Sequence, residues 1–122
     1  MKKLMLTIGL VFALSGCSVI STLEGTTISP TQVIVAGNSF DAIEATATNY
    51  LRLPLCPAAK LCRTAEATYA IIPSVRAARV ARNQMEAFVT ANPGTVVPVT
   101  LYNTAITAIN ALQSALTQYN VH

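Results

Sequence analysis

The chain has 122 residues, of which 52% are hydrophobic and 11% are charged, so it can form one small domain but not two. Eight Lys and Arg residues against five Asp and Glu residues give a net charge of +3, and two of the cations, Lys2 and Lys3, lie in a segment that we expect to be removed. The nearly neutral remainder excludes the strongly basic surface that nucleic-acid binding requires. The single histidine is His122 and there is no tryptophan, so most histidine-dependent catalysis is excluded as well.

The N-terminus has the pattern of a secretory signal peptide over residues 1–16. Two lysines precede an apolar run over 4–14, too short to span a membrane, and small residues follow it. The motif Leu14-Ser15-Gly16-Cys17 resembles the lipobox of bacterial lipoproteins. This resemblance implies that Cys17 becomes the new N-terminus and carries acyl chains such as palmitate. An ordinary signal peptide, or a buried N-terminal helix with an incidental cysteine, is the alternative.

Acylation would decide where the protein resides. Two or more acyl chains hold a protein stably on a bilayer. In the lipoprotein family, a serine after the acylated cysteine, here Ser18, implies sorting to the outer membrane of a Gram-negative host. We therefore expect a lipid-anchored protein on the periplasmic face of the outer membrane, with residues 17–28 as a flexible tether.

A first helix is expected at about 30–53. Ser29 can cap it, Pro30 suits its first position, and Gln32 completes a capping box. Gly37 inside this helix would let another helix approach closely. Apolar residues recur every three or four positions and predict one buried stripe: Val33, Ala36, Phe40, Ile43, Ala47 and Tyr50.

A turn with two prolines is expected over residues 54–63, because proline stops a helix. In the oxidising periplasm, Cys56 and Cys62 can form a disulfide within this turn. The alternatives are two free thiols or a metal pair. The metal pair is disfavoured because no further cysteine or internal histidine could complete four ligands.

Two more helices are expected at about 65–91 and 98–120. In the second, Pro73 indicates either a start near Ile72 or a kink after a short preceding turn. The third has the most regular apolar spacing in the chain, at Tyr102, Ala105, Ile109, Leu112, Leu116 and Tyr119. Three apolar stripes joined by short turns predict an all-α fold, an up-down-up three-helix bundle over residues 29–122.

Two groups of charged residues are candidates for chemistry. Asp41 and Glu44 could act as an acid/base pair or bind metal, but a solvated helix face explains them equally well and no partner motif accompanies them. We therefore predict no catalytic residues, no metal and no cofactor. Arg76, Arg79 and Arg82 could form a patch for an anionic partner, or a solubilising face in which Arg82 pairs with Glu86 at i,i+4.

The third predicted helix is the stronger candidate for an interaction surface. No Asp, Glu, Lys or Arg occurs from Ala87 to Val121. An uncharged face can lie against another protein without the desolvation cost of buried ions. We therefore predict an interface at Asn103, Thr107, Asn110 and Ser114, for an envelope protein or a second copy. The alternative is a central helix, or simply an Ala/Thr-rich helix with a polar face.

A second resemblance suggests possible roles. Around residues 40–42, 47–51 and 75–79 the chain is weakly similar to uncharacterised phage- and prophage-associated small helical proteins. This implies superinfection exclusion, a virion structural role or a lysis accessory role. The chain departs from the short, Pro-rich pattern of the spanin lysis lipoproteins. We expect a non-catalytic interaction module; a small hydrolytic enzyme using Asp41, Glu44, Tyr50 or Arg76 is the less favoured alternative.

Overall fold

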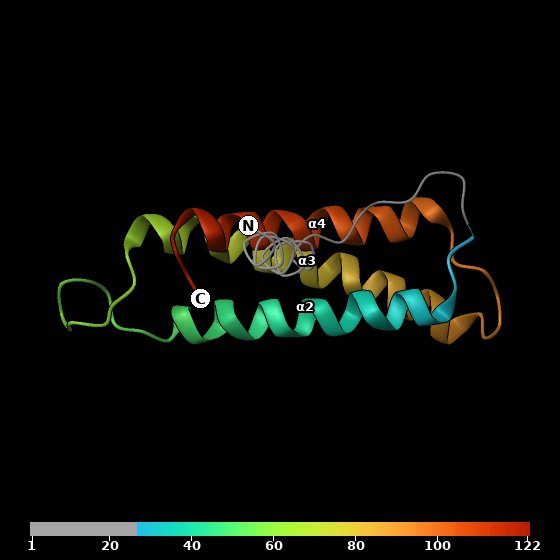
Figure 1. Cartoon of the computed structure of the whole chain (residues 1–122), viewed down its shortest axis with the longest axis horizontal. Coiled ribbons are helices and arrows are strands. Elements are labelled where there is room, and N and C mark those ends of the chain that lie inside the picture. Colours follow the sequence, from blue (N-terminus) through green and yellow to red (C-terminus); the bar gives the residue numbers. More distant parts are fainter. Residues whose placement is uncertain (1–26) are drawn as a thin grey trace, which may run out of the picture.

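The computed structural model describes residues 27–122, which form an all-α bundle. Its helices are α2 (Pro30–Leu51), α3 (Ala65–Ala91) and α4 (Val99–Gln118), and consecutive helices run in opposite directions (Figure 1). The predicted all-α bundle is confirmed. The predicted signal peptide, the candidate lipid site Cys17 and the tether up to residue 26 lie outside the described residues.

Helix α2 begins with the predicted capping box. The Ser29 hydroxyl accepts a hydrogen bond from the Gln32 amide at 3.3 Å, and the Ser29 amide donates to the Gln32 side chain at 2.8 Å. This reciprocal pair satisfies two backbone donors that a helix start leaves without partners. The helix ends at Leu51, two residues before the predicted end, and Pro54 follows closely.

Helix α3 is capped by Thr64, whose hydroxyl accepts from the Ala67 amide at 3.2 Å. It continues through Pro73 without a break, so the helix neither starts near Ile72 nor begins as a separate turn. Both Pro73 and Tyr69, whose carbonyl loses its amide partner, are exposed, and water can solvate that carbonyl. This explains why the proline is tolerated inside the helix.

The core follows the predicted apolar stripes. Most stripe residues are buried, while Ile43, Tyr50, Phe88, Val89 and Tyr119 pack partly buried at its margin. Alanines occupy many core positions, and their small side chains let the helix backbones approach closely. The fully buried core residues with large side chains are Ile28, Phe40, Ile71, Met85, Val97, Ile106, Ile109 and Leu112.

Three core residues lie outside the helices: Ile28, Val97 and Val121. Ile28 and Val97 are 0% and 1% exposed and form an isolated antiparallel bridge, in which the Val97 amide donates to the Ile28 carbonyl. The predicted tether over 17–28 is therefore wrong at its last residue, because Ile28 belongs to the folded domain. Burying the apolar side chain of Ile28 at the end of the bundle is more favourable than leaving it exposed to solvent.

Candidate functional site

The carboxylates Asp41 and Glu44 are engaged in ion pairs between α2 and α3. Glu44 accepts a hydrogen bond from Arg79 Nε at 2.7 Å and a second from Arg79 Nη2. Asp41 Oδ1 lies 3.3 Å from Arg82 Nη2, and the same nitrogen lies 2.9 Å from Glu86 Oε1. This arrangement is that of a polar seam joining two helices. Within residues 27–122, no group of three or more His, Cys, Asp or Glu side chains could hold a metal ion.

The seam bears on the two alternatives for Arg76, Arg79 and Arg82, which are a patch for an anionic partner and a solubilising face. Two of these three arginines are neutralised by carboxylates from α2, and the predicted Arg82–Glu86 pair is also present. Among the described residues, Arg76 alone of the three has no ion pair. The α2–α3 pairs join residues 35 and 41 positions apart in the chain, and sequence spacing could not reveal them.

Arg82 combines charge pairing with packing. Its guanidinium lies over the Phe40 ring, and its Nε is buried without a hydrogen-bond partner within the described part of the chain. Gly37 faces the same side chains, and a Cβ added there would meet Glu86 Oε1 at 3.6 Å and Arg82 Nε at 4.0 Å. These are ordinary contact distances to side chains, so the space beside Gly37 would also accommodate a Cβ.

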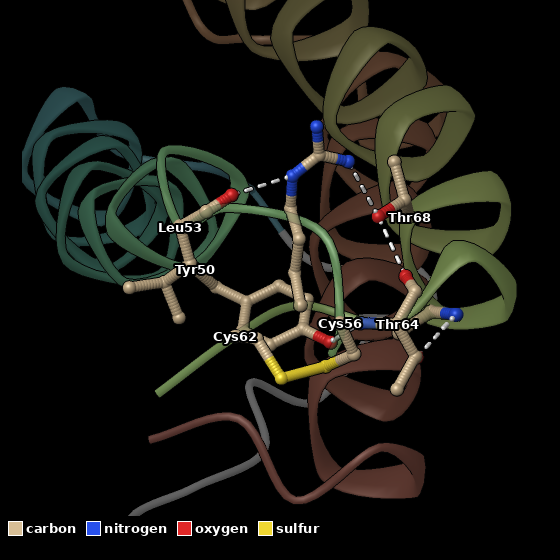
Figure 2. Close-up of a disulfide and its surroundings, with 8 residues drawn as sticks. Tyr50, Leu53, Cys56, Cys62, Thr64 and Thr68 are labelled. Atoms are coloured by element: carbon tan, nitrogen blue, oxygen red, sulfur yellow. Dashed lines mark hydrogen bonds between the residues drawn. A yellow bond between two sulfur atoms is a disulfide. The ribbon is translucent and has the colours of Figure 1, made fainter. Parts of the chain in front are cut away.

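The loop between α2 and α3 carries a disulfide between Cys56 and Cys62, whose Cα atoms are 5.0 Å apart (Figure 2). Two backbone hydrogen bonds close the base of this loop, from the Cys56 amide to the Arg63 carbonyl and from the Arg63 amide to the Pro54 carbonyl. The covalent link and the paired backbone restrict the same short segment.

Side chains attach the loop base to both flanking helices. Arg63 donates from Nε to the Leu53 carbonyl at 2.8 Å and from Nη1 to the Thr68 hydroxyl at 2.9 Å. The Thr64 amide donates to the Tyr50 hydroxyl at 2.9 Å (Figure 2). Sequence reasoning gave neither Arg63 nor Tyr50 this anchoring role. Arg63 directly follows Cys62, whereas Tyr50 belongs to the apolar stripe of the first helix and gave no signal of this role.

The outward side of α4 presents an open, nearly flat face lined by residues of this helix alone. Of the four residues predicted for an interface, Asn103 and Thr107 line it, while Ser114 is exposed further along α4 and Asn110 is half-buried. The face lies at the surface, which agrees both with an interface and with the alternative of an Ala/Thr-rich helix that has a polar face. Every lining side chain is small or uncharged: Thr100, Asn103, Thr104, Thr107, Ala108 and Ala111.

The comparisons with known proteins give no assignment: no family model, no curated protein and no solved structure matches this chain. None of the helices α2, α3 and α4 is long and apolar enough to cross a membrane.

Proposed function

We propose that the chain is a lipoprotein of the bacterial envelope, anchored through Cys17 to the periplasmic face of the outer membrane, and that its helical domain binds another protein without catalysing a reaction. The lipobox-like motif at residues 14–17 supports the anchor. The single observation that carries the binding role is the uncharged, open face of α4.

The distribution of charge supports the choice of α4. Helices α2 and α3 carry Asp41, Glu44 and all of the arginines that pair with them, whereas α4 has no charged side chain along its length. A partner helix that lies on α4 would displace water from hydroxyl, amide and methyl groups and would leave no ion unpaired. The small lining residues allow the two backbones to approach closely.

The binding role is tested by photo-crosslinking in envelopes of the native host. A photoreactive amino acid at the exposed position Thr104 should form a discrete adduct, and its mass distinguishes a second copy from a different envelope protein. Thr107→Lys should abolish the adduct, because it buries a charge in the interface. The matched control Gln84→Lys adds the same charge at an exposed position of α3 and should leave the adduct intact. Absence of any adduct, or equal loss with both lysines, overturns the proposal.

The anchor is tested separately by mass spectrometry of the native protein. The expected product begins at Cys17 and carries acyl chains. An intact Met1 without acyl groups would refute the anchor and would favour the virion structural role.

A further inference from the structure

The loop between α2 and α3 is more elaborate than a connection between two antiparallel helices requires. Such connections commonly take about 2–8 residues, whereas this one runs from Arg52 to Thr64 and projects beyond the bundle (Figure 1). No residue from 54 to 63 belongs to the hydrophobic core or packs against it. Folding of the bundle therefore does not explain the length of this loop.

The loop nevertheless has a fixed shape at its base. The disulfide, the paired backbone and the Arg63 and Tyr50 hydrogen bonds all act there. They hold the tip in one conformation before any contact is made. A preorganised tip binds more tightly than a flexible one, because less conformational entropy is lost on binding.

The tip itself is apolar and exposed. Leu61 is 72% exposed and Leu55 is 47% exposed, and between them Pro57, Ala58 and Ala59 are also exposed. Leu61 lies towards the tip of the loop and Leu55 at its base, beside Arg63. Exposed large apolar side chains on a projecting, restrained loop can enter the boundary between lipid headgroups and acyl chains.

The charge around the tip has one sign. No Asp or Glu occurs from residue 45 to residue 65, whereas Arg52 and Lys60 are both exposed. The third cation, Arg63, is held by its hydrogen bonds to Leu53 and Thr68. The loop therefore combines apolar side chains at its tip with unpaired cations beside them, which is complementary to an anionic lipid surface.

We propose that the cystine loop, residues 54–63, is a second membrane contact that inserts Leu61 and Leu55 into an anionic bilayer while Lys60 and Arg52 meet lipid phosphates. This contact is distinct from the α4 interface and lies at the end of the bundle opposite to the Ile28–Val97 bridge (Figure 1).

The lengths are compatible with two contacts on one bilayer. Helix α2 has 22 residues and therefore spans about 33 Å between Ile28 and the loop. The eleven residue-to-residue steps from Cys17 to Ile28 reach at most about 36–40 Å when extended. If the proposed anchor at Cys17 exists, the loop can touch the membrane that holds it and lay the bundle along the surface. The loop proposal depends on the proposed function only for this geometry.

The absence of tryptophan from the chain permits a direct test. The full-length protein with Leu61→Trp is reconstituted with phosphatidylcholine vesicles, with or without phosphatidylglycerol. With phosphatidylglycerol, the emission should shift to shorter wavelength and be quenched by lipids brominated in their acyl chains. The control Val80→Trp, at a 57% exposed position of α3, should keep the emission of a solvated indole.

Charge dependence provides the second readout. In the Leu61→Trp background, Lys60→Glu should lower the ratio of inserted to free loops about thirtyfold, and Lys60→Arg should preserve it. Unchanged emission with phosphatidylglycerol, or an equal shift without it, overturns the proposal. Shielding from aqueous quenchers in native envelopes but not on vesicles would assign the loop to a protein partner and also overturn it.

Failure of the anchor and failure of the loop are distinguishable. A protein that carries acyl groups at Cys17 but shows no shift with Leu61→Trp retains the anchor and refutes the loop proposal. A protein without acyl groups whose Leu61→Trp emission still responds to added anionic vesicles refutes the anchor and supports the loop proposal.

Discussion

The guanidinium carbon of Arg82 lies 5.8 Å from the centroid of the Phe40 ring, so the charged seam between α2 and α3 lies directly over the hydrophobic core. Phe40 is 1% exposed, and the Arg82 side chain covers part of the surface that would otherwise meet water. This cation–π contact supplements the ion pairs to Asp41 and Glu86. The seam therefore contributes to stability by packing as well as by charge.

Replacing Arg82 should cost more stability than replacing its neighbour Arg76. Arg82→Ala removes the cover over Phe40 and leaves Asp41 without its cation, and we expect the free energy of unfolding to fall by about 1–2 kcal/mol. Arg76→Ala, at an exposed position without an ion pair among the described residues, should change it by less than about 0.5 kcal/mol. Urea unfolding followed by circular dichroism measures both values. Equal midpoints for the two variants would contradict a packing role for Arg82.

A methyl group at Gly37 should stabilise the protein. Glycine inside a helix costs about 0.5–1 kcal/mol relative to alanine, and the structure leaves ordinary contact distances around an added Cβ at this position. Gly37→Ala should therefore raise the free energy of unfolding by about that amount. Gly94 provides the contrast, since its φ of 76° is unfavourable for any residue with a Cβ, and Gly94→Ala should destabilise. Thermal unfolding should show a higher melting temperature for Gly37→Ala and a lower one for Gly94→Ala. A lower melting temperature for Gly37→Ala would show that the seam has no room for a Cβ at this position.

Truncating Ile28 should show that the domain begins before α2. Ile28→Ala removes a fully buried side chain from the end of the core and should destabilise the protein by about 3 kcal/mol. Ile34 on α2 is 61% exposed, so Ile34→Ala makes the same chemical change at the surface and should cost less than about 0.5 kcal/mol. Chemical denaturation compares them directly. If Ile28→Ala lowered the free energy of unfolding as little as Ile34→Ala does, Ile28 would belong to the tether and not to the folded domain.

Removing the disulfide should lower stability while leaving the helices in place. The double substitution Cys56→Ser and Cys62→Ser releases a short loop, and the gain in unfolded-state entropy predicts a loss of about 2 kcal/mol. A reducing agent should shift the unfolding midpoint of the natural protein towards that of the variant and should leave the variant unchanged. If a reducing agent left the unfolding midpoint of the natural protein unchanged, the two cysteines would not be joined in solution.

Local signals predicted the helices well. The capping box at Ser29, Thr64 before α3 and Asn92 after it each determine a helix boundary through contacts within four residues, and such contacts are encoded in adjacent sequence. The apolar stripes identified the core for the same reason, because their period is that of the helix itself. Ile106 is buried although it lies outside the predicted apolar stripe of α4. Helices α2 and α3 both pack against α4, and together they cover a wider face than one stripe.

The features that sequence reasoning missed all depend on distant residues. The carboxylates of α2 meet the arginines of α3 only after the helices pack, and Ile28 joins the core only because Val97 lies beside it. Sequence spacing predicted the Arg82–Glu86 pair within α3 but not the pairs between α3 and α2. The uncharged face of α4 was predictable because an absence of charge along one helix can be read without knowing the fold.

Alkaline pH should destabilise the protein through Tyr102, which is 5% exposed on α4. Burial raises the pKa of the Tyr102 hydroxyl above its usual value of 10.0, because the phenolate would lose its hydration. The unfolded state therefore releases this proton at lower pH than the folded state does. The stabilisation is complete below pH 10 and is lost as the pH rises from 10 through the folded-state pKa.

Unfolding free energies measured from pH 8 upwards should decline above pH 10, and Tyr102→Phe should remove part of that decline. Tyr69→Phe is the matched control, since Tyr69 is 81% exposed and water solvates its hydroxyl in both states. If Tyr69→Phe flattened the alkaline decline as much as Tyr102→Phe does, burial of the α4 tyrosine could not be its cause.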